Sequence, residues 1–282
     1  MYLRPIHTSH SIPTLHSFIR ENPLGIFTTA LHAPPHAFIQ ASHIPWVLDV
    51  DVDDPGDLGR LRGHMARANP QAKAIIHNLS NSISNSISNS ISDPPTPSST
   101  PSILESQIMI LFNTPHQHYI SPRFYTSTKP TTGKVVPTWN YAAVQVYGEA
   151  RVYYHLDDDA EGEETSTFLD AQVRDLTDQE EGKINSRLRL GLGEGEGEGE
   201  GGPWKISDAP ASYISTLKKG IIGIEVRIQS IAGKYKMSQE LGSGDREGVV
   251  QGLGGLGGLG GLGEERAVKV AEMVKEWGGK TE

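Results

Sequence analysis

Runs of alternating apolar and polar residues recur along this chain, and they predict a protein built mainly from β-strands. Short runs occupy 25–31, 37–41 and 46–50, longer ones occupy 58–67, 107–112, 139–154 and 221–231, and a further strand begins at Tyr119. The strands follow one another instead of alternating with helices, which argues against a doubly wound nucleotide fold. The pattern predicts seven or eight strands in a small β-barrel within an α+β protein.

Helical periodicity is confined to a few stretches at the periphery of this strand pattern. Apolar residues recur at helical spacing in 15–21, 165–176 and 264–277, and Asn69-Pro70 and Pro210 are typical helix starts. We therefore expect a handful of helices beside the barrel, including short ones over 71–76 and 210–219.

Three segments of low complexity interrupt the pattern. Ser80–Leu104 repeats Ser-Asn-Ser-Ile and then turns proline-rich, Gly191–Gly202 alternates Gly with Glu, and Gly252–Gly263 repeats Gly-Gly-Leu. Such repeats cannot bury enough apolar surface to offset chain entropy. We predict a single domain over 1–282 with disordered insertions at 80–104, 191–202 and 252–263.

Composition adds little once these segments are set aside. They hold 15 of the 31 glycines and five acidic residues without a basic one, which is more than half of the net charge of −9. The chain has no cysteine, so disulfides, thiolate metal sites and a cysteine nucleophile are excluded. It shows no apolar run long enough for a membrane span and no signal-peptide pattern, so we expect a cytoplasmic or nuclear protein.

Familiar catalytic and metal-binding motifs are absent from the sequence. Neither a phosphate-binding P-loop nor a GxSxG nucleophile elbow occurs. His116 and His118 would share one strand face, but no third ligand is evident, so we favour a structural role and predict no metal site. His64 and Tyr141 are conceivable proton donors, yet a packed or hydrogen-bonded role is favoured for each, and the catalytic residues stay unknown.

Three segments are richer in polar chemistry than a barrel requires. Leu61–Gln71 places Arg62, His64 and Arg67 beside a turn that opens a helix, which is a suitable seat for a phosphate. Val136–Tyr147 opens a strand with an aromatic and hydrogen-bonding side chains. Gly233–Gln239 sets Lys234, Lys236 and Ser238 on one strand face, although two lysines there would also protect an edge strand from aggregation.

These segments carry a resemblance to a known family. The runs LRGHMARANPQ, YISPRFY, PTWNYAAVQVYGEARV, GIIGIEVRIQSIAGKYKMSQ and DREGVV, with FIRENPLGIFTT near the N-terminus, resemble the PaiB family of FMN-binding transcriptional regulators. That family belongs to the FMN-binding split barrels, which include the pyridoxamine phosphate oxidases. The resemblance covers the chain outside the three low-complexity segments.

The resemblance implies a homodimer of split β-barrels with FMN at the subunit interface. It implies that the FMN phosphate is held by the strand and turn containing Arg62, His64, Arg67 and Asn69. It also implies that Thr138, Trp139 and Asn140 line the flavin pocket, and that Lys234, Lys236, Ser238 and Gln239 reach the site, in one arrangement from the partner subunit. An enzyme of this kind would be an FMN-dependent oxidoreductase.

Two departures and two alternatives accompany this expectation. The family pattern S-Q-N-R reads Ser238-Gln239-Glu240-Leu241, which removes an arginine, and the stretch 115–122 is one residue longer than in the family. Some split barrels bind haem, and the chain has 11 histidines. A negative transcriptional regulator without catalysis is the other alternative, although the negative charge gives direct nucleic-acid binding little support.

Overall fold

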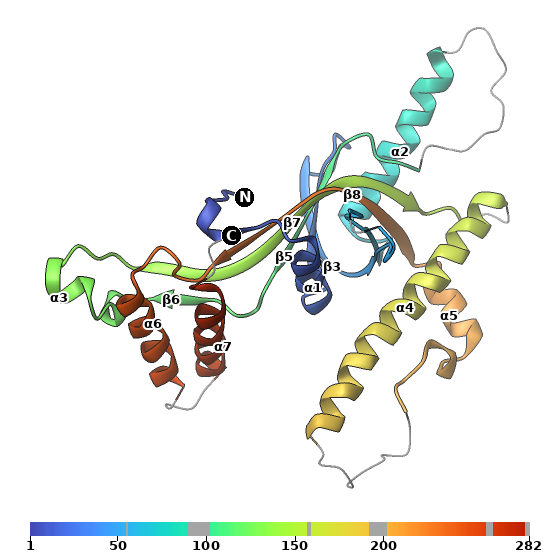
Figure 1. Cartoon of the computed structure of the whole chain (residues 1–282). Helices are drawn as coiled ribbons and strands as arrows, with labels where there is room; N and C mark the ends of the chain where they lie inside the picture. The colour runs from blue at the N-terminus through green and yellow to red at the C-terminus, as the bar shows by residue number, and fades with distance from the viewer. Residues whose placement is uncertain (55, 90–101, 157–158, 192–201, 258–261, 280–282) are drawn as a thin grey trace. The chain divides into compact units, whose positions relative to one another are not determined.

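The computed structural model describes residues 1–54, 56–89, 102–156, 159–191, 202–257 and 262–279 (Figure 1). Its contacts divide into two compact units that interleave along the chain. Unit 1 comprises 1–22, 111–146 and 231–282, and unit 2 comprises 23–110 and 147–230. This division does not test the predicted single domain, which stays a prediction.

An antiparallel sheet of eight strands is the centre of the fold. Its order is β1-β8-β4-β3-β2-β5-β7-β6, and a further pairing joins β8 to β7. That pairing closes six strands into a ring, namely β2 (Leu24–Ala30), β3 (Ile39–Asp49), β4 (Arg60–Ala66), β5 (Ile108–Asn113), β7 (Thr138–Tyr153) and β8 (Ile221–Lys236). The predicted α+β barrel is therefore confirmed.

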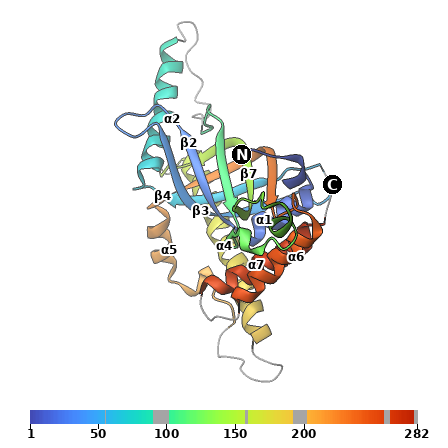
Figure 2. The same ribbon diagram turned by 90° about the vertical axis from the view of Figure 1, so that its left-hand side faces the viewer.

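Unit 2 contains most of the regular strand pairing. β2 pairs with β3 from Leu24 opposite Pro45 to Ala30 opposite Ile39, and β4 pairs with β8 from Arg60 opposite Arg227 to Ala66 opposite Ile221. Figure 2 shows β2, β3 and β4 as neighbours. Alternate residues of β2 and β4 are buried, as the period of two in the sequence predicts.

Three helices of unit 2 accompany these strands: α2 (Pro70–Asn89), α4 (Ala160–Gly191) and α5 (Ala211–Lys218). α4 packs its Phe168 ring in a stack on Tyr153, with ring centroids 4.0 Å apart. A Cβ on Gly223 of β8 would overlap the same Phe168 ring, so this glycine lets α4 approach the sheet closely.

Unit 1 contains the short strands β1 (Thr8–Ser9) and β6 (His118–Ile120), with helices α1 (Ile12–Glu21), α3 (Thr128–Thr132), α6 (Ser243–Leu256) and α7 (Leu262–Trp277). Tyr235 of β8 joins these elements because its ring stacks on Trp277 at 3.9 Å and meets Phe18 edge-on at 5.8 Å. The predicted helices at 15–21 and 264–277 are confirmed.

Glycines at every fourth position form one face of α6. A Cβ at Gly244, Gly248 or Gly252 would overlap Ser127, the Phe124 carbonyl oxygen or the Phe124 ring, respectively. The glycines therefore allow α6 to pack against the segment around the short 3-10 helix η2 (Pro122–Phe124). Asp245 of α6 is buried, and its carboxylate accepts hydrogen bonds from the backbone N–H groups of Ser127 and Thr128.

Some residues of the three low-complexity segments belong to described elements, and the predicted disorder of these segments stays a prediction. Residues 80–89 continue α2, 252–256 belong to α6, and the wholly buried Leu253 anchors that part of α6. Residues 102–104 are also ordered against β7, since the Leu104 N–H donates to the Ala150 carbonyl at 2.9 Å. A helix that has already nucleated extends at little cost per residue, whatever the composition of the added residues.

The remaining parts of these segments, 90–101, 192–201 and 258–261, lie outside the described residues. Within the described residues, none of the helices is both long and apolar enough to cross a membrane.

Candidate functional site

The strand β4 and the turn after it carry four of the predicted site residues, all in unit 2. Leu61 and Met65 are buried in the core, and the backbone of Gly63 lies against the Trp46 ring, where a Cβ would not fit. Alternation therefore places Arg62 and His64 together on the opposite face of β4.

Arg62 is held by two carboxylates from distant parts of the chain. Its Nε and one Nη donate to Asp49 at 2.5 and 2.8 Å, and the same Nη donates to Asp175 of α4 at 2.9 Å. The hydrogen bond and charge of Asp49 raise the pKa of the Arg62 guanidinium above its usual value. The charge of Arg62 is thus compensated within the protein.

Arg67 lies in the turn and has no such compensation. One Nη donates to the Tyr154 carbonyl at 2.5 Å, its Nε is buried without a partner, and no carboxylate pairs with it among the described residues. Burial lowers the pKa of this guanidinium. A half-buried cation without a counter-ion is a suitable partner for an anion such as a phosphate.

His64 is the uncharged member of this group. Burial lowers the pKa of its imidazole, which favours the neutral ring, and its buried Nδ1 has no hydrogen-bond partner. Asn69 has a structural task, because its Oδ1 accepts from the Gln71 N–H at 2.8 Å and so caps α2. Its Nδ2 donates to Ser42 at 3.0 Å.

A second group of predicted residues gathers in unit 1, at the start of β7 and the end of β8. The Lys236 ammonium donates to the Thr138 hydroxyl and to the Trp139 carbonyl, the latter at 3.1 Å. Asn140 is wholly buried, and its Nδ2 donates to the Ser238 hydroxyl at 2.9 Å while its Oδ1 has no partner. The Trp139 ring is half exposed and meets Tyr119 edge-on.

The turn after β8 is fixed by its own side chains. Ser238 has a φ of 61°, in the left-handed region that residues other than glycine seldom adopt. Gln239 supports this conformation, since its Oε1 accepts from the Met237 N–H at 2.7 Å and its Nε2 donates to the Tyr235 carbonyl at 2.5 Å. Ser238 and Gln239 thus set the backbone conformation of the turn that follows β8.

Lys234, two residues before Lys236 on β8, is buried. Its Nζ donates to the Tyr2 carbonyl at 2.9 Å and lies 5.8 and 5.4 Å from the ring centres of Tyr2 and Tyr141. Two aromatic faces stabilise the ammonium here. Lys234 therefore holds the N-terminal segment in place.

Glu240, one of the two departures from the family pattern, is part of an ion-pair network. Its carboxylate accepts from the buried His7 imidazole at 3.0 Å and lies 3.4 Å from the Lys236 ammonium. Burial alone would raise the pKa of Glu240, but a backbone N–H, His7 and Lys236 lower it overall. Sequence reasoning identified the position but could not find its partner, which lies 233 residues away.

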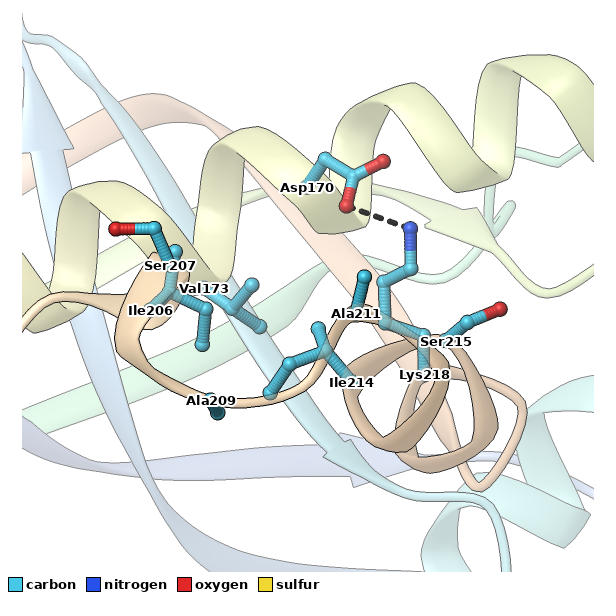
Figure 3. Close-up of a pocket in the computed structure, with 9 residues that line it drawn as sticks. All are labelled: Asp170, Val173, Ile206, Ser207, Ala209, Ala211, Ile214, Ser215 and Lys218. Atoms are coloured by element: carbon cyan, nitrogen blue, oxygen red, sulfur yellow. Dashed lines mark hydrogen bonds and ion pairs between the residues drawn. The ribbon is translucent and has the colours of Figure 1, made fainter.

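Sequence reasoning missed two further features of unit 2. Gln172 of α4 is wholly buried, and neither atom of its amide has a partner. The available signal was a polar residue within the apolar stripe of Phe168, Leu169, Val173 and Leu176. The other feature is a pocket of about 390 Å³ between α4 and α5, where Asp170 and Lys218 form an ion pair at 2.5 Å (Figure 3).

The predicted site residues therefore form two separate groups, one in each unit. The structure brings Arg62, His64, Arg67 and Asn69 onto one strand and turn. In unit 1, hydrogen bonds join Lys236 to Thr138 and Trp139 and join Asn140 to Ser238, while Gln239 bonds to the backbone of Met237 and Tyr235. No group of three metal-ligating side chains occurs in the part of the chain that the structure describes. The roles of these residues toward a cofactor stay predictions.

Comparison with known proteins gives the family. Residues 1–230 match the model described as "Putative FMN-binding domain". The chain belongs to this family. The predicted resemblance is confirmed, and the segment 231–282, which contains Lys234 to Gln239, lies beyond the matched residues.

Similar proteins occur in fungi and bacteria. An uncharacterized protein of Emericella nidulans is 47% identical over 255 residues, which cover 90% of each chain. An uncharacterized protein of Aspergillus fumigatus is 48% identical over 260 residues, again 90% of each. The protease synthase and sporulation protein PAI 2 of Bacillus subtilis is 25% identical over 254 residues, 90% of this chain and 89% of its own.

Solved structures resemble the chain only loosely. The flavocytochrome Anf3 from Azotobacter vinelandii has a TM-score of 0.40 at 12% identity, covering 81% of this chain and 68% of its own. A pyridoxamine 5'-phosphate oxidase-related, FMN-binding protein from Nostoc punctiforme has a TM-score of 0.32 at 10% identity, covering 83% and 86%. These scores are too low to support an inference about the site.

Proposed function

We propose that this protein is an FMN-binding flavoprotein and that Arg67 binds the phosphate of FMN. The observation that supports this proposal is the half-buried guanidinium of Arg67, which has an unpartnered Nε and no carboxylate beside it among the described residues. Folding leaves an uncompensated charge half-buried only at a cost, and a bound dianion would remove that cost. The family supports the same ligand.

The strand that leads to Arg67 fits FMN in a further respect. His64 is neutral, so it adds no charge to that of Arg67, and it precedes Arg67 by three residues. When bound, FMN would supply the redox chemistry that a chain without cysteine or a metal-ligand motif has to obtain from a cofactor. The protein's own residues bind the cofactor and control access to it.

The homodimer implied by the resemblance is part of this proposal. The Tyr119–Trp139 pair leaves two aromatic rings about half exposed on β6 and β7, a composition that is frequent at interfaces between subunits. In such a dimer Lys236 and Asn140 would reach a flavin shared by two copies of the chain.

A titration with FMN, followed by flavin fluorescence, tests the proposal. Arg67→Met should weaken binding about 10- to 100-fold, since it removes a charge-assisted hydrogen bond that contributes roughly 1.5–3 kcal/mol. Arg60→Met is the matched control, because Arg60 lies on β4 with 56% of its side chain exposed and a single 3.4 Å ion pair. Equal affinities of the two variants would contradict the assignment of Arg67.

Haem and nucleic acid are the other ligands that the sequence leaves open. Haem gives a Soret band, whereas flavin gives two well-separated bands, so one absorption spectrum distinguishes the two cofactors. A direct regulator should bind DNA with an affinity that falls steeply with salt.

A further inference from the structure

The long helix α4 has an apolar stripe that its own chain covers over only part of its length. Asp170 and Val173 line the pocket beside α5, and Figure 1 shows α5 next to the first half of α4. Ile184 follows Val173 by eleven residues, which is close to three full helical turns, so both side chains lie on one face of the helix. Leu188 follows Ile184 by four residues and belongs to the same face.

The covered part of this stripe ends near Glu181. The backbone N–H of Trp204 donates to the Glu181 carboxylate at 3.2 Å, and from there the chain leads to the residues that line the pocket. Beyond Glu181, Ile184 is 49% exposed and Leu188 is 57% exposed. The segment 192–201 lies outside the described residues, and its sequence offers one leucine among glycines and glutamates. The chain therefore supplies little apolar material of its own for this part of α4.

The last turns of α4 would gain stability from a partner. Most of the stability of a helix in a protein comes from packing its apolar face, because isolated helical turns are marginal in water. Within unit 2, α4 packs against β3, β4 and η3 (Ile206–Asp208). A partner that buried Ile184 and Leu188 would extend this packing to the C-terminal end of the helix.

The charges along the stripe indicate what that partner is. Glu180 lies one turn before Ile184, and Arg187 lies almost one turn after it. Both charged side chains are exposed, and their spacing of seven residues places them on the same side of the helix. In an antiparallel pair of identical helices the acidic end of one meets the basic end of the other, whereas a parallel pair would bring like charges together. This face is therefore complementary to itself.

We propose that the distal face of α4, formed by Glu180, Ile184, Arg187 and Leu188, is an interface between two copies of this chain. The two helices pack antiparallel about a two-fold axis, so that Ile184 and Leu188 of each copy cover those of the other. Glu180 of one copy faces Arg187 of the partner subunit. Lys183, which forms an ion pair with Glu180 at 2.6 Å, lies at the side of this face.

The size of this contact places it among the weak interfaces. Each copy contributes two apolar side chains and one complementary pair of charges, which is typical of transient association. None of its residues belongs to the groups assigned to FMN, so the inference goes beyond the proposed function and does not depend on it.

A single introduced cysteine tests the contact directly, because the chain has no cysteine of its own. Ile184 lies midway between Glu180 and Arg187 and hence close to the two-fold axis, so mild oxidation of Ile184→Cys should link two chains through a disulfide. Ser186→Cys is the matched control, because it lies on the same helix about 200° away from Ile184. Cross-linking of neither variant, or equal cross-linking of both, would overturn the proposal.

Sedimentation of the full chain tests the charge complementarity. At a concentration on the order of 100 μM, where weak interfaces still associate, the wild type should self-associate. Arg187→Glu should weaken this association about 10-fold, since it brings acidic groups together, and Glu180→Arg combined with Arg187→Glu should largely restore it. FMN affinity should stay the same in all three proteins.

The other outcomes separate the two proposals. Association that Arg187→Glu leaves unchanged, or that the double variant does not restore, would overturn the interface and leave the proposed function intact. A wild type that forms no larger species would overturn the interface as well. A wild type that self-associates and cross-links as expected but binds no FMN would overturn the proposed function alone.

Discussion

Arg62 and Arg67 lie five residues apart and differ in how their charges are balanced. Arg62 binds two carboxylates, one from β3 and one from α4, so it joins three elements of unit 2. Among the residues that the structure describes, the one partner of the Arg67 guanidinium is the Tyr154 carbonyl. The sequence predicts the same role for both cations. The structure gives them different partners, since Arg62 pairs with Asp175, which lies 113 residues away in the chain. No local pattern in the sequence reveals a partner at that distance.

Arg62→Met should destabilise the protein by about 1–3 kcal/mol, because it leaves two carboxylates close together without a cation. This loss is smaller than for a fully buried ion pair, since the side chains of Asp49 and Asp175 are each about one third exposed and solvent screens their charges. Urea unfolding at neutral pH measures this change. Arg60→Met should cost less than about 0.5 kcal/mol. A stable Arg62→Met variant would show that the two ion pairs contribute nothing.

Glu240 should make stability depend on pH on the acid side. The folded protein lowers the pKa of this carboxyl below its usual value of 4.5. The group therefore stabilises the fold fully above about pH 4.5, and this contribution is lost as pH falls through the lower pKa of the folded state. Urea unfolding at several pH values should show that Glu240→Gln reduces the free energy of unfolding at pH 7. The difference between the two proteins should shrink as pH falls below about 4.5, and a difference that stays constant would refute the assignment.

At the scale of elements, periodicity was a sound guide to strands and an incomplete guide to helices. The runs 58–67, 107–112, 139–154 and 221–231 all contain strands, because alternation follows directly from the geometry of a pleated sheet. α2 and α6 extend into repeats that composition marks as disordered. The extension of α2 starts from the local cap by Asn69, whereas that of α6 depends on packing against Phe124, which lies far away in the chain.

The glycine face of α6 gives a test with an internal control. Gly248→Ala should destabilise the protein by about 1–3 kcal/mol, since the new Cβ would overlap the Phe124 carbonyl oxygen. Gly254 lies on the same helix with no atom within 4 Å of a new Cβ, so Gly254→Ala should stabilise by about 0.5–1 kcal/mol. Thermal unfolding of both variants measures the difference. Equal effects would refute the close packing of α6 on η2.

At the scale of the whole molecule, the predicted site residues are divided between two interleaved units. Arg62, His64, Arg67 and Asn69 belong to unit 2, and the residues from Thr138 to Asn140 and from Lys234 to Gln239 belong to unit 1. The sequence predicts which segments contain the candidate site residues, because these segments carry more polar side chains than a barrel requires. It could not show that Lys236 bonds to Thr138 and Trp139 or that Asn140 bonds to Ser238, because these are tertiary contacts between β7 and the end of β8.

The most direct test of the central claim is the absorption spectrum of the full-length protein purified without added cofactor, then after adding FMN and removing the excess. A flavoprotein should carry the two flavin absorption bands at close to one FMN per chain after loading, and Arg67→Met should retain far less than Arg60→Met. Wild-type protein that stays colourless after exposure to FMN, or that shows a Soret band in its place, would contradict the account.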